Sequence, residues 1–181
     1  MKSLYILFKV LVLIIFMNSC SDSDKDKAKK TPKVKAKKYK NLDAYAKEHI
    51  KLQLRIPNSE KFTFKIYKEH LDNDGKIDAV ITVNRVAFAI IEASKSPNPA
   101  KKAELGFMGN YNYIFYYDGG LDLISPPIAI PSSPVAPLKV AFKNITSGDF
   151  KDVLIDFRIR NASFKDIYTV SNHTPRRIFQ W

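Results

Sequence analysis

A seven-residue stretch rich in aspartate holds the residues best suited to chemistry. Asp72, Asp74 and Asp78 surround Gly75, so three carboxylates lie close to a residue that permits a sharp turn. Crowded carboxylates favour a hard cation that binds through oxygen, and calcium is such an ion. The same residues also fit a tight Asp-Gly hairpin turn that needs no ion, with nearby basic side chains offsetting the charges. The residues alone leave both interpretations open.

The stretch from residue 72 to residue 78 resembles the acidic calcium loops of EF-hand, dockerin and FG-GAP proteins. With Gly75 at the sixth loop position, the resemblance implies four oxygen ligands at alternate positions: Asp72, Asp74, the backbone carbonyl of Lys76, and Asp78. Two further positions depart from the pattern. His70, a nitrogen donor, stands at the first position, and Ile81 stands at the twelfth, where an EF-hand needs a bidentate Glu. The departures argue against an EF-hand and leave two interpretations, a weak or vestigial calcium loop between two strands and the ion-free hairpin turn.

Residues for catalysis are sparse. The three histidines are far apart: His49 is expected on the exposed side of a helix, His70 precedes the acidic turn, and His173 lies in a loop. The chain contains no nucleophile elbow, zinc-protease helix motif or phosphate-binding glycine loop. The sequence therefore favours a non-enzymatic protein. A carboxylate-based hydrolase is the alternative, because Asp and Glu are plentiful.

The single cysteine of the chain, Cys20, follows a short apolar leader. One cysteine excludes an internal disulfide and a cysteine-built zinc site. The apolar stretch within residues 1–19 is interrupted by Lys9, so its unbroken part is shorter than the ~20 residues that span a bilayer. This pattern is typical of an export signal, with Ser19 as the small residue before the cysteine. An ordinary cleaved signal or a membrane anchor, with the cysteine incidental, is the alternative.

The segment around Cys20 resembles the lipobox of bacterial lipoproteins. The resemblance implies that residues 1–19 form a signal peptide that is removed, and that Cys20 carries a diacylglycerol and an acylated amino group. Met17 and Asn18 depart from the usual residues, as in the looser lipoboxes of Bacteroidetes. Residues 21–24 resemble the acidic tags that bring lipoproteins of that group to the cell surface. We therefore expect a protein anchored in membrane lipid of the bacterial cell envelope, in the outer membrane and exposed at its surface.

The lipidated cysteine and a basic tether make up residues 20–40. The tether contains nine Lys and three Asp, and its few apolar side chains cannot pack, so like charges keep it extended and solvated. Much of the formal net charge of +12 belongs to this segment. The tether could be a plain spacer, or it could contact anionic lipid headgroups or acidic polysaccharide. For an exported protein this charge does not indicate nucleic acid, and we expect an envelope protein or a glycan as the partner.

Residues 41–181 are expected to form one α+β domain, an N-terminal helix packed on a mainly antiparallel β-sheet. Asn41 can cap a helix whose apolar residues recur at helical spacing until Pro57 ends it. A second, short helix is expected at residues 99–105, after Asn98. Alternating or β-branched stretches predict strands at residues 62–67, 77–83, 111–117, 138–142, 153–159, 167–170 and 176–181.

Three features of this domain bear on function. Residues 111–117 are strongly aromatic and predict either a buried strand or a platform on which sugar rings stack. Residues 76–81 resemble residues 150–155, because each segment places an aspartate before an apolar strand. Two similar segments are too few for a β-propeller, which needs more repeated blades. Either Trp181 docks into the core, or the chain is a fragment of a longer protein.

Together these features predict a non-enzymatic, membrane-anchored lipoprotein with a binding or envelope-structural role. The alternative is a calcium-stabilised surface module for adhesion or glycan contact, and a hydrolase ranks below both. Apart from the lipid on Cys20, calcium is the one bound group that the sequence suggests.

Overall fold

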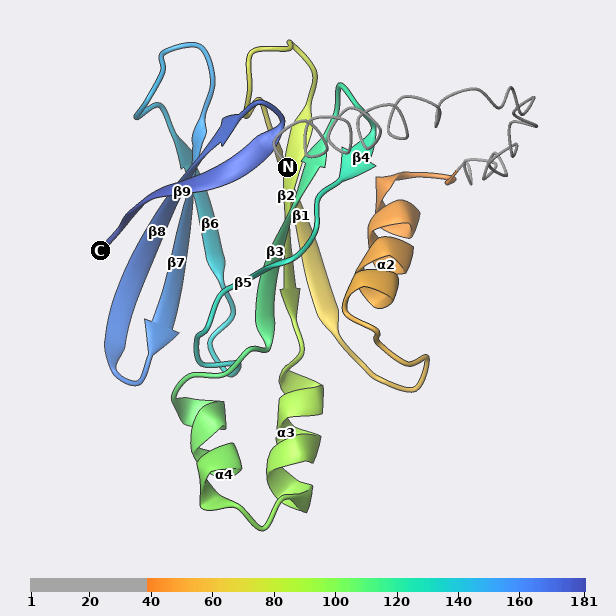
Figure 1. Ribbon diagram of the computed structural model, residues 1–181, viewed down its shortest axis with the longest axis vertical. Helices are drawn as coiled ribbons and strands as arrows, with labels where there is room; N and C mark the ends of the chain where they lie inside the picture. Colours follow the sequence, from red (N-terminus) through yellow and green to blue (C-terminus); the bar gives the residue numbers. More distant parts are fainter. Residues whose placement is uncertain (1–38) are drawn as a thin grey trace, which may run out of the picture. The chain divides into compact units, whose positions relative to one another are not determined.

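The computed structural model describes residues 39–181, and Tyr39–Trp181 form one compact unit (Figure 1). This part of the chain contains three helices and two antiparallel sheets, which confirms an α+β class with a mainly antiparallel sheet. The expected signal peptide, Cys20 and all but the last two residues of the tether lie outside the described residues. Within residues 39–181, no helix is both long and apolar enough to cross a membrane.

The first sheet contains β1 (Thr63–Glu69), β2 (Asp78–Asn84), β3 (Asn112–Asp118), β4 (Leu123–Ile124) and β5 (Ile128–Ala129). The strands follow the order β1-β2-β3-β4, with β5 also paired to β3, and every pair is antiparallel. Six of the seven residues of β2 are buried, which is the pattern of a strand covered on both faces.

The second sheet is a four-stranded meander of β6 (Lys139–Lys143), β7 (Asp152–Ile159), β8 (Ala162–Ser171) and β9 (Thr174–Gln180). Its strands pair antiparallel in the order of the chain, with one irregularity between β8 and β9. Expected strands at residues 153–159 and 176–181 match β7 and β9 closely, whereas β8 extends well beyond the expected residues 167–170.

The two helices expected from the sequence are present. Asn41 caps α2 (Leu42–Gln53), and its side-chain oxygen accepts a hydrogen bond from the Ala44 N–H at 2.9 Å. Asn98 caps α4 (Pro99–Gly106) in the same way, from the Ala100 N–H at 2.9 Å. In both helices a side-chain oxygen satisfies a backbone donor that the first helical turn leaves free.

A third helix, α3 (Val86–Lys95), was not expected from the sequence. It follows β2 and lies beside α4 at one end of the molecule (Figure 1). Only Ala89 and Ala93 of this helix are buried, while Ile90 and Ile91 remain exposed. The helix therefore buries small residues, and the larger apolar ones do not mark its packed face.

The main core lies between the two sheets. Its buried residues come from both sheets and from the segments that join them: Leu71, Val80, Ile114, Tyr116, Ile130, Leu138, Val153, Ile155, Phe157, Tyr168 and Val170. Burying one apolar face of each sheet against the other removes both faces from water, which is the main favourable term in folding.

A second hydrophobic cluster contains buried residues of α2 and of the first sheet. Ala46 and Ile50 of α2 lie in it with Ile81 and Phe115, whereas the neighbouring residues of β2 and β3 belong to the main core. Side chains of a strand alternate between its two faces, so β2 and β3 contribute to both clusters.

The expectation that His49 is exposed was wrong. The His49 ring packs edge-on against Phe115, with ring centroids 5.9 Å apart, and its Nε2 lies 3.3 Å from the Ser125 carbonyl oxygen. His49 is one helical turn from Tyr45 and next to Ile50, so it lies at the border of the packed face of α2. Burial lowers the pKa of His49 below its ordinary value.

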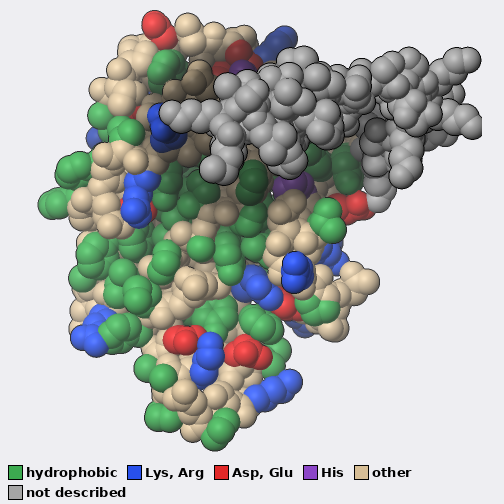
Figure 2. All heavy atoms as spheres, viewed as in Figure 1, with side chains coloured by type: hydrophobic (Ala, Val, Ile, Leu, Met, Phe, Trp, Pro, Cys, Tyr) green, Lys and Arg blue, Asp and Glu red, His purple; other side chains and the backbone are tan. Residues whose placement is uncertain are grey.

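Most of the aromatic run lies in the core. Tyr111, Phe115 and Tyr116 are buried, and Tyr113 and Tyr117 pack against the second cluster. The buried-strand interpretation is therefore confirmed. Trp181 does not dock into the core, because it is 79% exposed. Figure 2 shows that hydrophobic side chains also remain on the surface, with Lys and Arg side chains among them.

Candidate functional site

The loop between β1 and β2, which contains Asp72 and Asp74, is called the acidic loop below. Hydrogen bonds among its own residues close it. Asp72 Oδ1 accepts from the Asp74 N–H at 3.1 Å, and Asp74 Oδ1 accepts from the Lys76 N–H at 2.7 Å. The Lys76 carbonyl oxygen lies 2.8 Å from His70 Nδ1, and since a carbonyl only accepts, the imidazole donates. Side-chain hydrogen bonds of this local kind stabilise tight turns, as the ion-free interpretation predicts.

Asp78, the first residue of β2, is fully buried and connects two loops. Its Oδ2 accepts from the Leu71 N–H at 3.0 Å, and its Oδ1 accepts from the Gly119 N–H at 2.9 Å. The carboxylate thus satisfies backbone donors of the acidic loop and of the turn after β3. A buried charge is tolerated when hydrogen bonds to backbone donors replace its hydration.

The structure brings together three of the four ligands that the resemblance implied. Carboxylate oxygens of Asp72, Asp74 and Asp78 lie within 4.8 Å of one another. The carbonyl of Lys76, the fourth, accepts the hydrogen bond from His70. A calcium ion at this loop would therefore compete with hydrogen bonds that the loop already makes.

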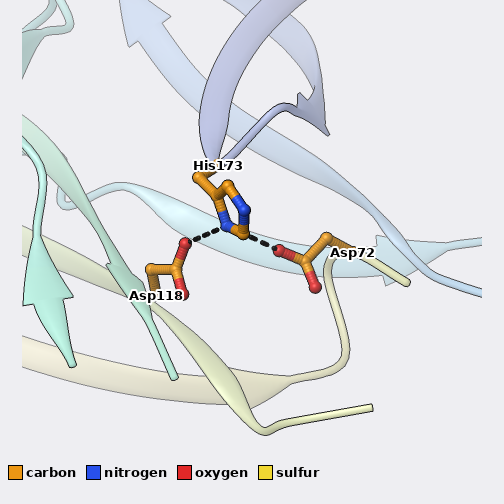
Figure 3. A group of neighbouring side chains, drawn as sticks. All are labelled: Asp72, Asp118 and His173. Carbon is orange, nitrogen blue, oxygen red and sulfur yellow. Dashed lines mark hydrogen bonds and ion pairs between the residues drawn. The ribbon is translucent and has the colours of Figure 1, made fainter. Parts of the chain in front are cut away.

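Two further residues, Asp118 and His173, complete the polar cluster at this end of the sheets (Figure 3). His173 Nδ1 lies 2.6 Å from Asp118 Oδ2 and 3.8 Å from Asp72 Oδ2. Asp118 is buried, and its Oδ1 accepts from the Leu121 N–H at 2.8 Å. Tyr116 donates its hydroxyl to Asp72 Oδ2 at 3.2 Å.

The Asp72–Asp118–His173 cluster is assembled from three separate connections. Asp72 lies between β1 and β2, Asp118 ends β3, and His173 lies in the turn between β8 and β9. The sequence predicted a loop at His173 but placed neither Asp118 nor His173 at a site. Since Asp118 and His173 are 55 residues apart, no local spacing joins them, and only the packing of the two sheets does.

The surroundings of Asp72 disfavour the charged form of its carboxyl group. Burial raises the pKa of the Asp72 carboxyl above its ordinary value, and the charges of Asp78 and Asp74 act in the same direction. Burial also raises the pKa of Tyr116, which faces these carboxylates, so this residue stays a neutral donor. A cation beside Asp72 would relieve the repulsion, and two carboxylates with an imidazole are a ligand set that divalent metals accept.

The second sheet repeats the arrangement found at Asp78. Asp152, the first residue of β7, is buried and accepts from the Ile145 N–H at 2.9 Å and the Thr146 N–H at 2.7 Å. In both hairpins the buried aspartate accepts a hydrogen bond from the backbone N–H of the residue seven positions before it, which is Leu71 for Asp78 and Ile145 for Asp152. Burial alone would raise the pKa of Asp152, but hydrogen bonds led by those from Thr146 outweigh it, so the pKa lies below its ordinary value.

The two hairpin loops also touch each other. The Lys151 N–H donates to the His70 carbonyl oxygen at 2.9 Å. The similarity between residues 76–81 and 150–155 therefore corresponds to the same local arrangement in both sheets. In each, a buried aspartate at the start of a strand accepts hydrogen bonds from backbone N–H groups of the loop before it.

Comparison with known proteins found no match. It matches no family model, no curated protein and no solved structure. The functional argument therefore depends on the residues and geometry described above.

Proposed function

We propose that this chain is a non-enzymatic lipoprotein, held in membrane lipid through acylated Cys20, whose exported domain binds an envelope protein or a glycan. The observation that carries the membrane part is the position of the single cysteine directly after a short apolar leader. Each buried CH₂ of an acyl chain contributes about 0.8 kcal/mol, so two or more chains give stable anchoring. The outer membrane and its exposed surface belong to the same proposal, because residues 21–24 resemble surface-export tags.

The geometry of the carboxylates supports a non-enzymatic protein over a carboxylate-based hydrolase. Asp78, Asp118 and Asp152 are buried, and each accepts hydrogen bonds from backbone N–H groups of neighbouring loops. Groups held in this way fix loop structure. The expected packing of an N-terminal helix on the sheet is part of the proposal, and the shared cluster of Ala46 and Ile50 with the first sheet supports it.

The anchor is tested by expressing the full chain in a Gram-negative bacterium that processes lipoproteins, with labelled palmitate in the medium. The intact mass from the membrane fraction should match residues 20–181 plus lipid, and the label should be incorporated. Cys20→Ala should lose the label and leave the membrane, because the only acylated side chain is gone. Ser21→Ala is the matched control and should keep the palmitate label and the membrane location of the unaltered protein. A Cys20→Ala protein that stays in the membrane would remove the lipid anchor from the proposal.

A calcium-stabilised surface module is the second candidate. The close approach of the Asp72, Asp74 and Asp78 oxygens favours it, as does the raised pKa of Asp72, which burial and neighbouring charges produce. In this version calcium stabilises the loop and the domain serves adhesion or glycan contact. Lipid anchoring is compatible with both candidates.

A further inference from the structure

The outer face of the second sheet carries a row of polar and aromatic side chains that crosses all four strands. Lys139 of β6 pairs with Asp156 of β7, and Asp156 pairs with Lys165 of β8. Trp181 continues the row beside β9, because Lys165 and Trp181 exchange two backbone hydrogen bonds of 2.7 and 2.9 Å. Residues directly opposite in antiparallel strands point to the same face, so these four side chains lie together.

This row is on the side of the sheet away from the main core. Ile155 and Phe157, the neighbours of Asp156, point into that core, and side chains of a strand alternate between its faces. A groove of about 510 Å³ lies over the row, with Val135, Pro137, Arg158 and Ser163 also in its walls. Its volume falls within the range of small-ligand sites, about 300–1,000 Å³. We call it the β6–β9 groove.

The groove offers an exposed indole. Trp181 is 79% exposed and Val135 is 59% exposed, so two large apolar side chains in the walls of the groove face water. A tryptophan presents a broad flat apolar surface together with one N–H donor. Such a surface suits the flat face of a sugar ring, whose rim carries hydroxyl groups.

The groove also carries unmatched positive charge. Lys165 Nζ lies 2.5 Å from Asp156 Oδ1, which neutralises that pair. Lys139 and Arg158 are exposed and, within residues 39–181, lie in no ion pair. They are diagonal neighbours on adjacent strands, where side chains lie near enough to bind one anion together. Arg binds carboxylates through two N–H groups, and its neighbour adds a second charge.

We propose that the β6–β9 groove binds an acidic glycan, with one sugar ring stacked on Trp181 and the carboxylate of another uronate ring of the same glycan paired with Lys139 and Arg158. The indole accounts for the sugar ring and the two unmatched cations account for the carboxylate. The inference deepens the proposed binding role and rests on it. It does not depend on the lipid anchor or on calcium.

The test uses the full processed chain and hexagalacturonate as the probe. Trp181 is the only tryptophan, so a change in its fluorescence on titration reports the groove directly. Hexagalacturonate should change the fluorescence, whereas neutral cellohexaose and the acidic peptide hexaglutamate should bind at least about tenfold more weakly, a difference of about 1.4 kcal/mol. Equal binding of hexaglutamate would overturn the glycan assignment.

Variants separate the groove from the basic tether. Lys139→Glu should weaken hexagalacturonate binding at least about tenfold by fluorescence, and Trp181→Ala should do the same by calorimetry. Lys102→Glu on α4 and Phe179→Ala on β9 are controls for charge and for exposed aromatic area, and both should stay within about twofold. All four positions are at the surface, so each variant should keep the circular dichroism of the parent. Binding that survives Lys139→Glu and Trp181→Ala would assign the glycan to the tether and overturn the proposal.

The two proposals fail separately. A protein that binds hexagalacturonate but carries no lipid would contradict the anchor alone. A lipidated protein that does not bind hexagalacturonate would contradict glycan binding in the β6–β9 groove alone.

Discussion

At the scale of single residues, the aspartates of the acidic loop differ in how fully their oxygens are used. Asp78 binds a backbone N–H with each oxygen. Asp74 binds the Lys76 N–H through Oδ1, while its Oδ2 lies against Gly120. Of the three aspartates, Asp74 is therefore the one whose charge can be removed with the least disturbance of the turn, and its loss takes one of three carboxylates from a calcium site.

We predict that Asp74→Asn keeps the melting temperature of the calcium-free protein and abolishes its response to calcium. Asparagine keeps the oxygen that accepts from Lys76 and loses the charge. With a Kd of about 0.1 mM, typical of the tighter extracellular sites, 10 mM calcium would stabilise the parent by about 2.7 kcal/mol. This corresponds to a rise of about 5–11 °C for a domain of this size. Thermal melts with and without calcium measure it.

Asp149→Asn, in the exposed loop between β6 and β7, is the control, and it should respond to calcium as the parent does. An unchanged melting temperature of the parent, or an equal rise in Asp74→Asn, leaves only the ion-free turn.

The sequence predicted the part of the site that is local. Asp72, Asp74 and Asp78 come together because they belong to one short loop, whose spacing can be read along the chain. Asp118 and His173 join them only through the packing of two sheets, and neither residue has a neighbouring pattern that indicates it. Tertiary proximity of this kind leaves no periodic signal in a single sequence.

At the scale of elements, the turn after β3 fits closely against the acidic loop. A Cβ atom on Gly119 would lie 2.1 Å from the Ile77 carbonyl oxygen, which is backbone and cannot swing aside. The absence of a side chain here lets Asp78 reach the Gly119 N–H. Close backbone approach is one of the few local reasons that require glycine.

We predict that Gly119→Ala destabilises the protein by about 1–3 kcal/mol, the range for forcing extra atoms into a packed site. Gly148→Ala, in the loop between β6 and β7 of the second sheet, is the matched control. A Cβ there meets no atom within 4 Å and its φ is not in the left-handed region. That variant should be neutral or more stable by about 0.4–1 kcal/mol. Urea unfolding compares the two, and equal stability of both variants would contradict the close approach.

Elements with capping or alternating residues were predictable, and α3 was not. Asn41 and Asn98 mark their helices by a side chain that binds the first turn. The sequence of α3 is a short apolar run whose N-cap residue, Arg85, makes no capping hydrogen bond through its side chain, and such a run fits a buried strand as well as a helix. Its packing through Ala89 and Ala93 decides between them, and packing is a tertiary property.

At the scale of the whole molecule, the two sheets depend on one shared core. Val80 and Ile114 of the first sheet lie in the same cluster as Ile155 and Val170 of the second. The His173–Asp118 contact and the Lys151–His70 hydrogen bond join the sheets again at the loops. A core shared in this way predicts cooperative unfolding of both sheets together.

We predict that Ile155→Ala lowers the stability of both sheets equally. Ile155 is fully buried on β7, so its truncation should cost about 2–5 kcal/mol through lost burial and the cavity left behind. Native-state hydrogen exchange should show the protection of β2 and β3 amides falling by the same free energy as that of β7 and β8 amides. Ile178→Ala, on exposed β9, is the control and should change protection by less than about 0.5 kcal/mol. If β2 and β3 amides keep their full protection in Ile155→Ala, the sheets unfold independently, and the shared core does not couple them.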